Sequence, residues 1–148
     1  MENMFSHHNF KTKLAYWTLA VSSLVGAITM ALVVPQLITS GSETSMYVLV
    51  SALLVMLVLN TYFAYSIYQR SEKALTLCLW LYGLQIIGFK TEYLSFSLSF
   101  GFQLTFSWSF DSFSFSVNVA AVIIWFIVYS ALKSVRKAKL TKGSAHAN

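Results

Sequence analysis

Hydrophobic and polar residues alternate with a period of two over residues 93–119. Leucine, phenylalanine and tryptophan occupy every second position of 94–110, and serine, threonine, glycine or glutamine occupies the positions between. Successive side chains of a β-strand point to opposite faces, so the pattern predicts one apolar face and one small polar face. The alternation changes phase after Asp111-Ser112, which predicts a β-hairpin that turns at these two residues.

The first arm of this predicted hairpin is too long for one regular strand. Residues 94–110 would extend about 58 Å, well beyond the usual strand length. Gly101 is the expected bend, because glycine within a strand often marks a bulge or kink. The residues expected to shape this segment are the bend, the turn and the large apolar side chains: Phe96, Phe100, Gly101, Phe106, Trp108 and Asp111.

The apolar face of such a hairpin must be covered, because a lone two-stranded hairpin is not stable in water. Three arrangements would cover it. The hairpin can form a lid over the ends of helices, or lie in the bilayer interface with its aromatic side chains inward. Copies of the chain can also join edge to edge into a larger sheet or barrel. The sequence leaves all three open.

Long apolar runs on either side of this segment predict membrane-spanning helices. The runs over 14–37 and 46–68 contain no charged residue, and each reaches the roughly 20 residues that cross a bilayer. Two shorter uncharged runs cover 74–89 and 117–132. The sequence therefore predicts one mainly α-helical membrane domain over 1–148, with four transmembrane helices and the hairpin between the third and fourth.

The positions of the basic residues predict the orientation of these helices, because lysine and arginine collect on the cytoplasmic side. With both termini in the cytoplasm, nine of the ten basic residues lie inside and only Lys90 lies outside. The net charge of +5 is therefore a topology signal and does not predict a nucleic-acid partner. The cytoplasmic tail 133–148 is predicted to bind anionic lipid or to dock a cytosolic protein. Its basic residues are Lys133, Arg136, Lys137, Lys139 and Lys142.

Small and carboxamide residues inside the predicted spans indicate helix packing. Ser23, Ala27 and Ala31 recur at every fourth position, which lets two helix backbones approach closely. Their partner is either the second span of the same chain or another copy in a homo-oligomer. Asn60 and Gln85 lie at similar depths, which predicts a hydrogen bond between the second and third spans. The alternative is that these two residues line a path for ions or small solutes.

The residues do not predict an enzyme, a metal site or a cofactor. The outer serines have no histidine or paired base to activate them. The histidines, His7, His8 and His146, form no ligand cluster of the usual spacing.

In size and layout the chain resembles the small accessory membrane proteins that bacteria use in phage defence, exclusion and toxin immunity. The resemblance covers topology alone. It implies a sensor or effector subunit of the bacterial inner membrane that signals to a cytosolic partner. The alternative is an oligomeric pore-former, and a third possibility is a structural subunit of a larger membrane complex.

Overall fold

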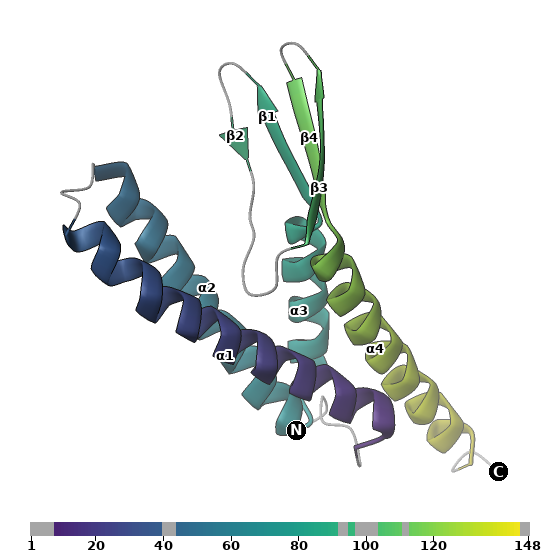
Figure 1. The fold of residues 1–148 in the computed structure, drawn as a ribbon. Coiled ribbons are helices and arrows are strands. Elements are labelled where there is room, and N and C mark those ends of the chain that lie inside the picture. Colours follow the sequence, from purple (N-terminus) through teal and green to yellow (C-terminus); the bar gives the residue numbers. More distant parts are fainter. Residues whose placement is uncertain (1–7, 40–43, 92–94, 97–103, 111–112, 146–148) are drawn as a thin grey trace.

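A computed structural model describes residues 8–39, 44–91, 95–96, 104–110 and 113–145 (Figure 1). Most of these residues are helical. The helices are α1 (Phe10–Thr39), α2 (Thr44–Tyr68), α3 (Glu72–Gln85) and α4 (Val119–Ala145). Within the described ranges, α1, α2 and α4 are long and apolar enough to cross a membrane. The chain is therefore a mainly helical protein with the properties of a membrane protein, as the sequence predicts.

The four helices pack together at the end of the molecule that holds both termini (Figure 1). From there α1 and α2 run as one antiparallel pair, and α3 and α4 lead as a second pair toward the sheet. The buried core lies where the pairs meet, and its fully buried side chains include Leu19, Ile67, Leu75 and Val128. Lipid removes most of the hydrophobic drive between helices, so this packing depends on close contact and hydrogen bonds.

The third helix is shorter than the sequence predicts. It begins after Ser71, whose hydroxyl accepts a hydrogen bond from the Ala74 amide at 3.3 Å. It ends at Gln85, and Ile87–Thr91 forms strand β1. The helix therefore covers only residues 74–85 of the predicted span 74–89, and with 14 residues α3 is not among the helices long enough to cross a membrane. A short apolar run does not distinguish helix from strand by its pattern, and pairing with another strand decides.

Four strands form one antiparallel sheet in the order β2-β1-β4-β3. The other three strands are β2 (Ser95–Phe96), β3 (Thr105–Phe110) and β4 (Phe113–Asn118). Strands β3 and β4 are antiparallel, with Phe110 paired with Phe113, and the predicted turn Asp111-Ser112 between them lies outside the described residues. Further along β3 and β4, apolar residues lie opposite apolar residues and serine lies opposite serine: Phe106 with Val117, Trp108 with Phe115, and Ser107 with Ser116. This register confirms a two-faced hairpin.

The sheet is nevertheless larger than the predicted hairpin over 93–119. Phe96 belongs to β2, which pairs with β1 and is separate from β3. Strands β2 and β3 lie at opposite edges of the sheet, so the long arm is not one continuous strand. Phe100, Gly101 and Asp111 lie outside the described residues.

Asn118 joins the sheet directly to the last helix. It is the final residue of β4, where it pairs with Thr105. Its side-chain oxygen also accepts a hydrogen bond from the Ala121 amide at 3.3 Å, which is the geometry of a helix N-cap. The fourth helix therefore begins at Val119, two residues later than predicted, and no loop separates it from the sheet.

Candidate functional site

A buried polar cluster holds the first three helices together around Asn60, which is 1% exposed. Its Nδ2 donates to Ser23 Oγ at 2.9 Å and to the Leu19 carbonyl at 3.2 Å. The Tyr82 hydroxyl donates to Asn60 Oδ1 at 2.8 Å. One side chain from α2 therefore binds both α1 and α3.

The predicted partner of Asn60 was Gln85, and the structure places another residue there. Tyr82 takes that place one turn earlier on the same face of α3. Gln85 is also buried, and its Oε1 has no hydrogen-bond partner among the described atoms. Residues three apart on a helix share a face. The sequence therefore also allowed Tyr82 as the partner of Asn60. Because Asn60 and Gln85 are packed inside the helices, they do not line an open path within one subunit.

The predicted stripe of small residues on α1 is buried only at Ser23, whereas Ala27 and Ala31 are exposed. The face of α1 that packs inside the molecule instead follows alternating steps of three and four residues at its start. Its buried residues are Thr12, Ala15, Leu19, Ser22, Gly26 and Met30. This spacing is the usual signal of an inward helix face, and it is readable in the sequence. Ala27 and Ala31 remain available to a second copy.

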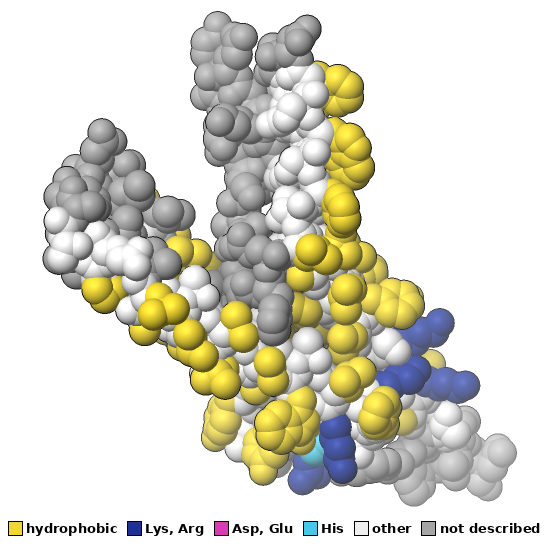
Figure 2. Space-filling view, in the orientation of Figure 1, with side chains coloured by type: hydrophobic (Ala, Val, Ile, Leu, Met, Phe, Trp, Pro, Cys, Tyr) yellow, Lys and Arg dark blue, Asp and Glu magenta, His cyan; other side chains and the backbone are white. Residues whose placement is uncertain are grey.

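The large apolar side chains of β3 are uncovered. Phe106, Trp108 and Phe110 are 57%, 55% and 70% exposed. The sheet projects away from the helices and does not fold over their ends (Figure 1), so the lid arrangement is not adopted. Figure 2 shows apolar side chains in a column along the sheet that continues down the neighbouring helix surface. Exposed apolar area of this extent usually marks contact with lipid or with another protein.

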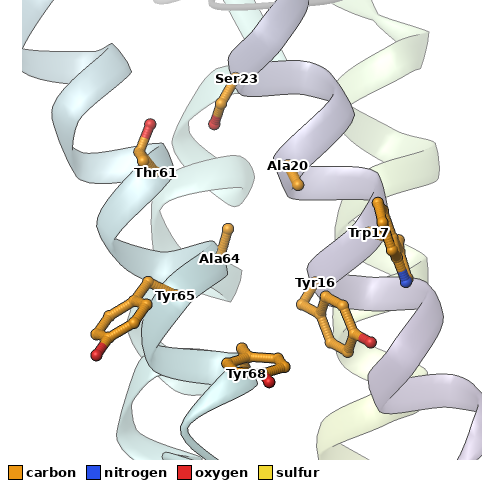
Figure 3. A pocket seen from close by; sticks show the side chains of 8 residues that line it. All are labelled: Tyr16, Trp17, Ala20, Ser23, Thr61, Ala64, Tyr65 and Tyr68. Atoms are coloured by element: carbon orange, nitrogen blue, oxygen red, sulfur yellow. The ribbon is translucent and has the colours of Figure 1, made fainter.

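Aromatic side chains line a groove between α1 and α2 near the end that holds the termini (Figure 3). The groove has a volume of about 440 Å³. Its residues are Tyr16, Trp17, Ala20, Ser23, Thr61, Ala64, Tyr65 and Tyr68. Tyr16 meets Tyr68 edge to face with ring centres 5.7 Å apart. Tyrosine and tryptophan concentrate at membrane interfaces, so this groove fits the predicted inner boundary of the membrane.

The predicted docking tail is an extension of α4, which runs to Ala145. All five of its basic residues lie on this helix. Two of them bind the first turn of α3: Arg136 Nε lies 3.4 Å from Glu72 Oε1, and Lys139 binds Glu72 Oε2. This clasp was not predicted, although Glu72 is the one acidic residue in the predicted inner loop between the second and third spans. Arg136 and Lys139 therefore have a partner within the chain, whereas Lys133 and Lys137 lie along a groove of α4.

The Glu72 clasp is expected to weaken in acid. Hydrogen bonds from Lys139, together with the charges of Lys139 and Arg136, hold the pKa of Glu72 below its usual 4.5. A lowered pKa means that the clasp contributes fully above about pH 4.5 and is lost as the pH falls through the lower folded value.

Replacing Glu72 with glutamine should therefore cost about 0.5–1 kcal/mol at pH 7, since Arg136 is largely exposed. The cost should be smaller at pH 3, because the Glu72 carboxyl is then protonated in part and the clasp is weakened. Denaturant titrations of both proteins at the two pH values measure it. An equal cost at both pH values would contradict an ionic clasp.

Comparison with family models, with curated proteins and with solved structures gives no match to this chain.

Proposed function

We propose that the chain is a non-enzymatic sensor or effector subunit of a bacterial inner membrane. In this proposal both termini are cytoplasmic, the sheet lies outside and the basic end of α4 lies inside. The outer sheet meets an incoming agent, and the inner end of α4 passes the signal to a cytosolic partner. The distribution of the basic residues supports the orientation.

The observation that carries the proposal is the direct passage from β4 into α4 at Asn118. A helix of 27 residues extends about 40 Å, so α4 reaches from the sheet to the Glu72 clasp. With no loop at the junction, a displacement of the sheet tilts α4. The contacts of Arg136 and Lys139 with Glu72 lie at the far end of the same helix. Binding at the sheet would in this way change which basic side chains face the cytoplasm.

The exposed aromatic side chains of β3 provide the receiving surface. They are exposed along the strand and are not part of the buried core. A partner of this surface would be apolar, such as a membrane-inserting segment of a phage or toxin protein. The layout that the chain shares with defence and exclusion proteins supports this setting.

Phage challenge of cells with and without the protein tests the proposal. We expect the wild-type chain to lower the plating efficiency of at least one phage in a broad panel. The variant Phe110→Ser should lose this protection while reaching the membrane at the wild-type level. Tyr47→Ser is the matched control. Tyr47 is also an exposed aromatic residue, but it lies near the start of α2 and outside the sheet. Identical plating across the panel with and without the protein would exclude a defence role.

A pore formed by several copies is the second candidate, and the free edge of the sheet favours it. β3 is an edge strand, and all six of its residues are exposed. Edge strands can pair with another chain, and joined sheets would present their serine faces together. Planar bilayers containing the purified protein separate the two candidates: a pore conducts ions, whereas a sensor alone does not.

A further inference from the structure

A basic groove lies between the first turns of α1 and the middle of α4. It has a volume of about 490 Å³. Lys11 from α1 and Lys133 and Lys137 from α4 supply its charge, and Phe126 and Tyr129 supply its apolar part. A neighbouring hollow of about 350 Å³ shares Tyr129, Lys133 and Lys137. The groove therefore lies where the apolar part of α4 gives way to the basic part.

Asn9 fixes the start of α1 against α4 and so builds this groove. Its Oδ1 accepts a hydrogen bond from the Thr12 amide at 2.9 Å, and Thr12 Oγ1 accepts one from the Asn9 amide at 3.0 Å. This reciprocal pair caps the helix. The Nδ2 of the same Asn9 donates to Ser134 Oγ at 2.7 Å. The cap and the link to α4 together hold Lys11 on the same groove as Lys133 and Lys137.

The groove carries positive charge and no negative charge of its own. None of its lining residues is acidic. Glu72 is the one acidic residue in the described parts of the chain, and Arg136 and Lys139 engage it. Lys133 and Lys137 lie one helical turn apart, where like charges repel. Figure 2 shows basic side chains gathered near the lower end of the apolar column. An anion placed among the three ammonium groups would relieve this repulsion.

We propose that the groove binds the phosphate-bearing headgroup of an anionic phospholipid from the inner leaflet. A phospholipid has the polarity of the groove: its phosphate would lie among the lysines, and its acyl chain would lie along Phe126. Basic pockets between helices on the cytoplasmic side commonly hold such headgroups. The proposal needs the inner orientation of the groove but does not depend on the sensor role. The proposed lipid does not use Arg136 and Lys139, which lie on the side of α4 that contacts Glu72 and could contact a protein partner.

Native mass spectrometry of the full-length protein in neutral detergent tests the groove with three probes: dioleoylphosphatidylglycerol, cardiolipin and dioleoylphosphatidylcholine. Lys133→Gln/Lys137→Gln should weaken the binding of the two anionic lipids by about 30-fold, at about fivefold per basic residue. Phosphatidylcholine binding should not change. Lys133→Arg/Lys137→Arg should keep the affinity, because it retains the charge.

Lys13→Gln/Lys73→Gln is the matched control. It removes the same charge at two exposed lysines outside the groove, and we expect a loss of less than threefold. An equal loss in both double variants would mean diffuse attraction, and no loss in either would mean no lipid site. Both results would overturn the proposal. So would an acidic soluble peptide that binds the groove more tightly than the lipids. Unchanged thermal unfolding of each variant shows that the fold is intact.

Discussion

Replacing Asn60 with alanine is expected to destabilise the folded chain by about 3 kcal/mol. The variant loses the hydrogen bonds to Leu19, Ser23 and Tyr82. Hydrogen bonds between membrane helices contribute about 0.6 kcal/mol on average and up to about 1.7. The substitution also leaves two hydroxyl groups without their partner in a dry interior and opens a small cavity. Unfolding in mixed micelles with increasing dodecyl sulfate, followed by circular dichroism, measures the change.

Two further variants allow the cost of Asn60→Ala to be compared with that of smaller losses. Tyr82→Phe removes a single hydrogen bond and should cost about 1 kcal/mol. Thr61→Ala removes an exposed hydroxyl beside Asn60 that binds only its own helix, at the Leu57 carbonyl, and should cost little. A cost for Asn60→Ala no larger than that for Thr61→Ala would mean that the cluster does not hold the three helices together.

The hairpin was predictable from sequence because its signal is local. Alternation over a few residues determines which side chains share a face, and the change of phase marks the turn. The observed pairs, Trp108 with Phe115 and Ser107 with Ser116, follow directly from these two features. The long uncharged runs were equally reliable for α1 and α2, since length and polarity alone define such helices.

The rest of the sheet was not predictable, because it depends on contacts between distant residues. β1 becomes a strand through its pairing with β4, for example Ile87 with Val117, some thirty residues further along the chain. Nothing local separates Ile87 from the apolar end of a helix. The hydrogen-bond partners of Asn60 also depend on contacts between residues far apart in the sequence. Depth along a helix limits the choice to a few residues, but the rotation of each helix selects Tyr82 over Gln85, and packing sets that rotation.

In the proposed topology, where α3 and α4 both cross the membrane, their short apolar parts lead to a second effect, on the placement of the sheet. α4 is apolar from Val119 to Leu132, about 21 Å, and α3 is apolar from Ala74 to Gln85, about 18 Å. The hydrocarbon layer is about 30 Å thick. The difference between the hydrocarbon thickness and the apolar length of each helix is roughly 9–12 Å, which corresponds to about three strand residues at 3.4 Å each. The bases of β1 and β4 are therefore expected to complete both spans, with the apolar face of the sheet in contact with lipid.

A lysine at Phe106 should then cost more than a lysine at Phe110. Phe106 pairs with Val117 beside the start of α4, whereas Phe110 pairs with Phe113 at the far end of the sheet, about 14 Å further from the helices. The cost of a lysine facing lipid is about 2–4 kcal/mol at the bilayer centre and approaches zero at the interface. Phe106 would lie in the outermost few ångströms of the hydrocarbon layer, so we expect about 1 kcal/mol for Phe106→Lys and about zero for Phe110→Lys, measured as unfolding free energies in lipid bicelles.

The two phenylalanines form a matched pair, because they lie on the same edge strand and both are more than half exposed. A sheet that stood wholly in water would give equal and small costs at both positions. A second copy covering the whole apolar face would give equal and large costs. Only immersion of the base of the sheet makes the cost fall from Phe106 to Phe110, so the difference between the two variants reports the depth of the sheet directly.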